Sequence, residues 1–130
     1  MLIRNGNDFL EMIPLERVAE HLPTPGDTRF AVRIQSGAFS GQGTTWIDFS
    51  ALQKFADDMK RLERTRSGHA ETLSISPNEF RLVVSTIDGW GHVAVSGRLA
   101  RNKQAVEFCF EFSSEVLSML CNDVQELSQT

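Results

Sequence analysis

The histidines, serines and carboxylates of this 130-residue chain could do chemistry, but their spacing matches no catalytic or metal-binding motif that we searched for. His21, His69 and His92 lie far apart, with no second histidine or carboxylate at metal-ligand spacing. Serine is frequent, yet no G-x-S-x-G sequence is present, which argues against the nucleophile turn of the α/β-hydrolases. We therefore expect no bound metal and no serine hydrolase.

Two glycine motifs and one pair of glutamates also do not match the binding or catalytic sites that they resemble. Gly41-Gln42-Gly43 and Gly89-Trp90-Gly91 lack the third glycine and the strand-to-helix setting of a dinucleotide site, so we interpret them as loop glycines. Glu107 and Glu111 resemble a catalytic carboxylate pair, but residues four apart on a strand are separated by about 13 Å. Glycoside hydrolysis requires about 5 to 9.5 Å. The sequence thus predicts neither an enzyme nor a cofactor.

A hairpin is predicted where two alternating strands flank Asp88-Gly89, a dipeptide typical of two-residue turns. With this turn, Val84 lies opposite Val93, and Glu79 lies opposite Arg98. The apolar residues of the two strands then share one sheet face. A slip by one residue would separate them, so the turn type and the hydrophobic pattern favour the same register.

The next hairpin is predicted to turn at Asn102-Lys103. This turn places Val95 opposite Phe110 and Arg98 opposite Glu107, which extends both the apolar face and the polar face. The three strands of the two hairpins therefore form a meander with one apolar face.

Further strands are expected before this meander. Leu73 and Ile75 are predicted to join its apolar face through a turn near the following proline. The segment from Phe9 to Arg17 is either a strand or a short helix broken by its proline, and we prefer the strand. The segment from Arg29 to Gln35 alternates and is predicted to pair with Thr44 to Ile47 across a loose, glycine-rich loop.

Two amphipathic helices flank the meander. The first is predicted from about Phe49 to Arg64, with Asp48 as its N-cap or, alternatively, with Ser50 and Gln53 as a capping box. The second is predicted to begin after Ser113 or Ser114 and to reach Ser128. Their apolar stripes are Leu52, Phe55, Ala56, Met59 and Leu62 in the first helix, and Val116, Leu117, Leu120, Val124 and Leu127 in the second.

These elements predict an α+β fold, in which an antiparallel sheet of about six to eight strands forms a meander and both helices pack on its apolar face. At 130 residues and 41% hydrophobic content, the chain is expected to be one domain spanning residues 1–130.

The sequence also predicts a compartment. No apolar run exceeds three residues, so we expect neither a membrane-spanning helix nor a secretory signal. Cys109 and Cys121 lack a C-x-x-C spacing, and we interpret both as structural thiols. A cytoplasmic protein with no membrane contact is the expectation.

The net charge of −4 is unevenly distributed. The segment from Gln104 to Thr130 contains five carboxylates and no cation, so we expect it to repel nucleic acid. Its charges either steer a basic protein partner or simply aid solubility. The first predicted helix is rich in basic residues, and contacts between two copies of the chain, as in a homodimer, are a further alternative. The basic residues are Lys54, Lys60, Arg61, Arg64 and Arg66, and the acidic ones are Glu107, Glu111, Glu115, Asp123 and Glu126.

The polar face of the meander is the best candidate for a binding surface. It is either an ion-pair ladder of little energetic consequence or a docking surface for a protein partner. At the hairpin end, Trp90 and His92 are of the residue types that anchor protein interfaces, and an exposed Trp90 would favour the docking interpretation. The candidate partner-binding residues are Arg81, Trp90, His92, Arg98, Glu107 and Glu111.

Several short motifs resemble the WapI-like immunity proteins of bacterial polymorphic-toxin systems and a related group of uncharacterised bacterial proteins. The motifs are Trp46-Ile47-Asp48, the helix with Leu52 and Phe55, Gly91-His92-Val93, and the closing Phe108-x-Phe110-x-Phe112-Ser-Ser-Glu115-x-Leu117. The resemblance implies a small cytoplasmic α+β protein, without catalysis, that inhibits a toxin domain by binding it. The alternative is a small enzyme or ligand-binding domain with its site near Trp90 and His92, and the neighbouring genes would separate the two.

Overall fold

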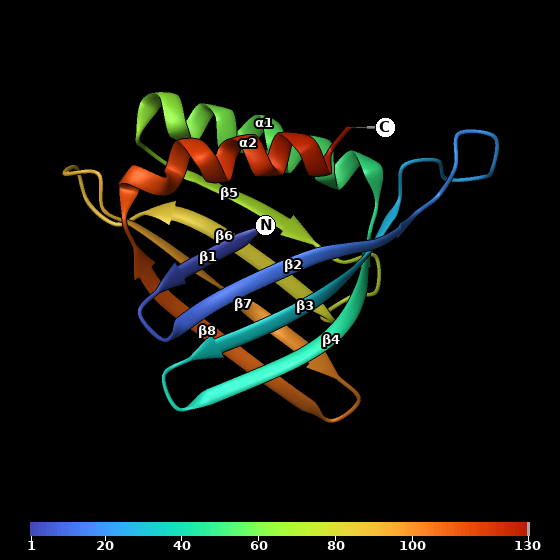
Figure 1. The fold of residues 1–130 in the computed structure, drawn as a ribbon, viewed down its shortest axis with the longest axis horizontal. Helices are drawn as coiled ribbons and strands as arrows, with labels where there is room; N and C mark the ends of the chain where they lie inside the picture. Colours follow the sequence, from blue (N-terminus) through green and yellow to red (C-terminus); the bar gives the residue numbers. More distant parts are fainter. Residues whose placement is uncertain (130) are drawn as a thin grey trace.

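The computed structural model describes residues 1–129, which form two antiparallel sheets of four strands and two α-helices (Figure 1). Within each sheet, the strands follow one another in chain order. The first sheet contains β1 (Leu2–Asn5), β2 (Asp8–Arg17), β3 (Thr28–Ser36) and β4 (Phe39–Ile47), and the second contains β5 (His69–Leu73), β6 (Phe80–Thr86), β7 (Val93–Arg101) and β8 (Gln104–Phe112). The predicted α+β class and antiparallel meander are confirmed, and the eight strands are divided between two sheets.

Helix α1 (Phe49–Thr65) begins where the sequence predicts. The Asp48 carboxylate accepts a hydrogen bond from the backbone N–H of Ala51 at 2.6 Å, so Asp48 is the N-cap. Ser50 donates its hydroxyl to the same carboxylate, and the competing capping box is not formed. After a short 3-10 helix, η1 (Ser114–Val116), helix α2 (Leu117–Leu127) closes the chain.

The core lies between the two sheets and beneath the helices. Helices α1 and α2 lie side by side, and α1 also packs on β5 and β6 (Figure 1). Strands β3 and β4 of the first sheet contact β7 and β8 of the second, so much of each apolar face is covered by the other sheet. Every residue of the predicted α1 stripe is buried, and one core cluster joins both sheets and both helices.

The first sheet is more regular than predicted. The preferred strand over Phe9 to Arg17 is confirmed as β2, with a register shift between Pro14 and Glu16. The expected loose loop after β3 is wrong, because Ser36 and Phe39 lie opposite each other across a tight turn.

Gly41 and Gly43 therefore lie in β4 rather than in a loop, which corrects our interpretation of this motif. An added Cβ at Gly41 would lie 3.0 Å from Cγ2 of Val106, so the missing side chain lets β4 approach β8 closely.

The predicted register of the first meander hairpin is wrong by two residues. Val84 lies opposite Val95, and Arg81 lies opposite Arg98. The cause is the loop, because the backbone N–H of Ile87 donates to the carbonyl of His92 at 2.9 Å and leaves four residues, 88–91, in the connection. A shift of two residues keeps every side chain on its predicted face.

The second hairpin is confirmed, with Val95 opposite Phe110 and Arg98 opposite Glu107. Leu73 and Ile75, in contrast, do not join the apolar face, since each is 50% exposed. The buried residues of β5 are Ala70 and Thr72, and Leu73 lies opposite Arg81 on the solvent side.

Candidate functional site

The solvent side of the second sheet, which we call the outer face, carries the polar residues that the sequence analysis singled out. Alternate residues of each strand point to it because side chains on a strand alternate between faces. From the helix η1 end to the opposite end, the outer face consists of three rows: His69, Ser85, Ala94 and Glu111; then Glu71, Val83, Ser96 and Cys109; then Leu73, Arg81, Arg98 and Glu107.

The charged row differs from the predicted one. We expected Glu79, Arg98 and Glu107 to align, but the corrected register replaces Glu79 with Arg81. Glu79 precedes β6, and its carboxylate accepts a hydrogen bond from the hydroxyl of Thr45 at 3.3 Å, on the first sheet. Two guanidinium groups and one carboxylate therefore share the row.

These charges do not form an ion-pair ladder. Arg81 pairs with Glu71 on β5, with Nε 3.3 Å from Oε1. In the described part of the chain, no salt bridge joins Arg98 to the neighbouring Glu107, although the two residues lie opposite each other. One exposed pair of this kind contributes less than about 1 kcal/mol to stability, so the charges of this row add little to the stability of the fold.

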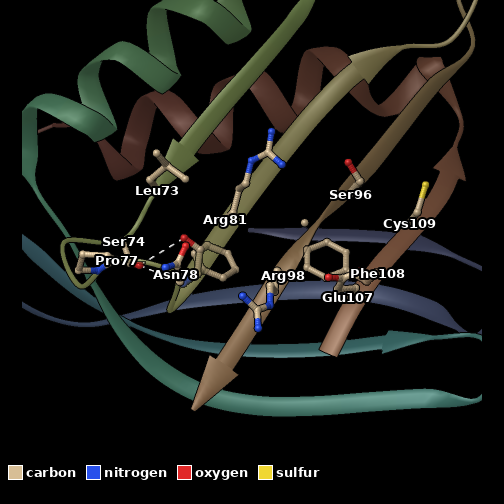
Figure 2. A pocket seen from close by; sticks show the side chains of 12 residues that line it. Leu73, Ser74, Pro77, Asn78, Arg81, Ser96, Arg98, Glu107, Phe108 and Cys109 are labelled. Atoms are coloured by element: carbon tan, nitrogen blue, oxygen red, sulfur yellow. Dashed lines mark hydrogen bonds between the residues drawn. The ribbon is translucent and has the colours of Figure 1, made fainter. Parts of the chain in front are cut away.

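A groove of about 740 Å³ opens between the turn after β5 and this row (Figure 2). Gly97 and the rings of Phe80 and Phe108 form part of its lining. Gly97 has no side chain, which lets the backbone of β6 and the ring of Phe108 approach it closely. An added Cβ there would lie 1.9 Å from the carbonyl oxygen of Arg81 and 2.9 Å from Cζ of Phe108.

The sequence analysis missed this groove. The available signal was the glycine itself, because a glycine inside a strand often marks the close approach of another backbone or a ligand. Figure 2 shows Arg98 and Glu107 side by side on adjacent strands, with Arg81, Ser96 and Cys109 beside them.

The β6–β7 loop projects beyond the sheet (Figure 1) and presents Trp90 to solvent with 89% of its surface exposed. Hydrogen bonds within the loop hold its shape. Oδ1 of Asp88 accepts hydrogen bonds from the backbone N–H groups of Trp90 at 2.8 Å and His92 at 3.4 Å. Gly91 has a φ of +87°, a conformation that glycine adopts without strain. The indole is thus carried on an ordered turn.

Asp88 and His92 also form a charge pair. The hydrogen bond to the Asp88 carboxylate raises the pKa of His92, the negative charge of Asp88 adds to the rise, and Glu111 contributes a smaller effect in the same direction. The same hydrogen bond, aided by the N–H of Trp90, lowers the pKa of Asp88. Each group therefore stabilises the charged form of the other at this end of the outer face.

The structure brings the six predicted site residues together in two groups. Arg81, Arg98 and Glu107 border the groove, whereas Glu111 and His92 lie near the loop that carries Trp90. Arg98 lies six positions after His92, a span of about 20 Å along the strand direction. The two groups lie at opposite ends of the outer face.

Among residues 1–129, no group of three or more His, Cys, Asp or Glu side chains is arranged to hold a metal ion. Within the same residues, no helix is both long enough and apolar enough to cross a membrane.

Comparisons with known proteins identify one family and one similar fold. The model of the Immunity protein WapI-like family matches residues 1–130. A chain of the "Crystal structures of trypanosoma bruciei MRP1/MRP2" is similar with a TM-score of 0.55 and 11% sequence identity, over 98% of this chain and 80% of that chain. At this identity, the similarity concerns the fold alone. A search of curated proteins gave no match.

Proposed function

Because the chain belongs to the WapI-like immunity protein family, we propose that it binds a toxin domain and inhibits it by direct contact, without catalysis. The proposed contact surface is the outer face together with the β6–β7 loop. We further propose that residues 1–130 act as one domain in the cytoplasm, since both cysteines are free thiols, which a reducing compartment preserves.

The observation that carries this proposal is the exposure of Trp90. A tryptophan that is 89% exposed on an ordered loop contributes little to the stability of the free protein. Trp is among the residues that dominate binding energy at protein interfaces, where it fills a pocket of the partner. Because Asp88 already holds the loop, little conformational entropy is lost when the indole is buried.

The outer face suits a broad protein contact. It carries separated positive and negative side chains with small residues, Ala94 and Ser96, between them. Charges spread in this way select a partner of complementary pattern and steer its approach. The basic and acidic helix surfaces leave contact between two copies of the chain as a further possibility for the same measurements.

The alternative of an enzyme or ligand site around Trp90 and His92 has less support. The His92 side chain is 68% exposed, and Trp90 is almost fully exposed, so the loop offers no walls that exclude water from a reacting group. Exposure of this kind suits contact with another protein better than it suits chemistry.

The test is binding to the toxin domain encoded beside the gene of this protein, measured by calorimetry and by inhibition of the toxin. We expect Trp90→Ala to weaken binding by at least about thirtyfold, the loss that corresponds to roughly 2 kcal/mol at an interface hot spot. Phe39→Ala is the matched control, because Phe39 is 70% exposed but lies at the start of β4, in the other sheet.

The two variants must have the melting temperature of the wild type within error for the comparison to count. If Trp90→Ala and Phe39→Ala both retain wild-type affinity, the loop is not part of the interface. If the wild-type protein neither binds nor inhibits the toxin domain, the proposed function itself is wrong.

A further inference from the structure

Strand β4, the outermost strand of the first sheet, directs part of its backbone away from the sheet (Figure 1). Ser36 and Phe39 are the pair that closes the two-residue turn, so alternate residues from Phe39 onward bond to β3. The residues between them point their N–H and C=O groups outward. The carbonyl of Trp46 bears out this alternation, because it accepts the N–H of Ile75, which lies outside the sheet, at 2.8 Å.

The outward groups of residues 40–44, which we call the open edge, have no partner of this kind. Within residues 1–129, no backbone group bonds to the outward N–H and C=O groups of Ser40, Gln42 and Thr44. The sequence from 35 to 47 contains no charged residue and no proline, the residue types with which proteins protect an exposed edge. The open edge is therefore ready to pair with another strand.

The other edges of the two sheets are shorter or protected. Along β8, Asn5 donates its side-chain amide to the carbonyl of Glu111, and the hydroxyl of Ser36 accepts the N–H of Cys109. Strands β1 and β5 have four and five residues, and Pro14 interrupts β2 where it extends past β1. The nine-residue strand β4 lacks these protections over the open edge.

A groove of about 290 Å³ adjoins the open edge, between residues 40–42 and the end of the β7–β8 hairpin. Its accessible apolar wall consists of Ala105, which is exposed, and Val106, which is half-buried. A strand added to β4 would lie about 4.8 Å from it, and alternate side chains of that strand would face the hairpin. The edge thus offers main-chain hydrogen bonds together with a place for a side chain, the two components of recognition by strand addition.

The charge around the groove is positive. Arg101 is the one charged residue that lines it, and its Nη1 donates to the hydroxyl of Thr44 at 3.5 Å. Within residues 1–129, no salt bridge pairs Arg101 with a carboxylate. Lys103 adds a second exposed cation in the hairpin turn. A second copy paired at this edge would bring its own two cations beside these, whereas a segment that carries carboxylates would be attracted.

We propose that the open edge receives an extended, acidic segment of a protein partner as an added strand. An apolar side chain of that segment lies against Ala105 and Val106, and a carboxylate lies at Arg101. This inference goes beyond the proposed function, because it assigns a second binding surface on the first sheet, apart from the outer face of the second sheet.

The test uses a peptide probe and requires no toxin. Acetyl-Glu-Thr-Val-Thr-Val-Glu-amide is titrated into the full-length protein while backbone amide signals are followed by NMR. We expect saturating shifts and slowed hydrogen exchange at Ser40, Gln42 and Thr44, with a dissociation constant of roughly millimolar order. The same peptide with lysine in place of both glutamates should bind about fivefold more weakly at low salt, the effect of an exposed charge pair.

Two N-methylated peptides test strand pairing itself. One carries N-methyl groups on both valines and the other on both threonines. Only alternate N–H groups of an added strand face β4, so one of the two peptides should lose binding and the other should retain it. Equal binding of the two would contradict pairing at a strand edge.

Variants of the protein assign the site. Gln42→Pro removes an outward N–H that does not bond to β3, so the fold tolerates it while saturable binding of the acidic peptide is abolished. Gln42→Ala is the matched control, because it removes the side chain and keeps the N–H, and it should bind like the wild type. Arg101→Gln should reduce the preference for the acidic peptide over the lysine peptide. Thermal melts verify that each variant is folded, and the N-methylated peptides decide the question if Gln42→Pro does not fold.

Four results would overturn the inference, and none of them involves the toxin. These are the absence of saturable shifts along the open edge, equal binding of the two N-methylated peptides, wild-type binding by folded Gln42→Pro, and self-association through this edge. The last would appear as a dimer in sedimentation together with concentration-dependent protection of the Gln42 amide, and would make a second copy the occupant. Toxin binding is measured separately, so the proposed function stands or falls independently of these results.

Discussion

Asp88 and His92 are joined across the β6–β7 loop, with Oδ2 of the carboxylate 2.6 Å from Nδ1 of the imidazole. The other carboxylate oxygen accepts the backbone N–H groups of Trp90 and His92. One side chain therefore makes three hydrogen bonds within the loop that carries Trp90 and helps to hold its shape.

This pair predicts a defined pH dependence of the loop. The pKa of His92 is raised above 6.5, so its contribution to loop stability is full below pH 6.5 and is lost as the pH rises through the folded pKa. The pKa of Asp88 is lowered below 3.8, so its contribution is present above pH 3.8 and is lost as the pH falls through the folded value. We expect the loop to be most ordered between these two pH values.

NMR titration of the His92 ring and relaxation of the Trp90 amide measure the two effects. Asp88→Asn should return the pKa of His92 toward 6.5 and increase the mobility of Trp90. A wild-type His92 that titrates at or below 6.5 would contradict the prediction.

Gly97→Ala should destabilise the protein strongly. The added methyl group would lie 1.9 Å from the carbonyl oxygen of Arg81, which is backbone and cannot rotate away. We expect a loss of about 3 kcal/mol in the free energy of unfolding, at the upper end of overpacking effects, measured by urea denaturation. Gly89→Ala is the control, because an added Cβ there meets nothing within 4 Å, and it should change stability by less than about 0.5 kcal/mol.

Asp48→Ala should cost about 1 kcal/mol of stability through the loss of the α1 N-cap. Asp48→Asn keeps an acceptor for the N–H of Ala51 and should recover most of this loss. Ser50→Ala removes only a hydroxyl that donates to the cap, so it should have a smaller effect in the same denaturation experiment. A large loss for Ser50→Ala together with a small loss for Asp48→Ala would indicate that the serine, and not the aspartate, maintains the cap.

The two cysteines should react at different rates. Cys109 is exposed on the outer face, whereas Cys121 is buried on α2, and burial raises the pKa of its thiol. Since the thiolate is the reacting form, a disulfide reagent should modify one thiol of the folded protein quickly and the second only on unfolding. Cys109→Ser should eliminate the fast phase, and a fast phase that persists in this variant would place Cys121 at the surface.

Local patterns predicted the elements whose stability depends on near neighbours in the chain. The stripe from Leu52 to Leu62 and the cap at Asp48 predict α1 correctly, because helix contacts connect residues three and four apart. The turn at Asn102-Lys103 predicts the β7–β8 register correctly, because a two-residue turn and the hydrophobic pattern of both strands agree.

The β6–β7 register shows where this reasoning fails. Strand side chains alternate with a period of two, so a shift of two residues preserves every face and is invisible to the hydrophobic pattern. The Asp88 side chain binds the loop backbone and adds two residues to the connection. The longer connection places Arg81 instead of the predicted Glu79 opposite Arg98, so the row carries a positive charge where a negative one was expected.

By itself, the amino-acid sequence determined the two helices, the alternating strands and the face on which most side chains lie, because these follow from local periodicity and capping. Only the tertiary structure decided that the strands form two facing sheets, since long-range packing selects which apolar face covers which. The Gly97 groove and the projecting Trp90 depend on the same long-range arrangement. The groove is lined by residues of β5, β6, β7 and β8, which are distant in the sequence and meet only in the folded chain.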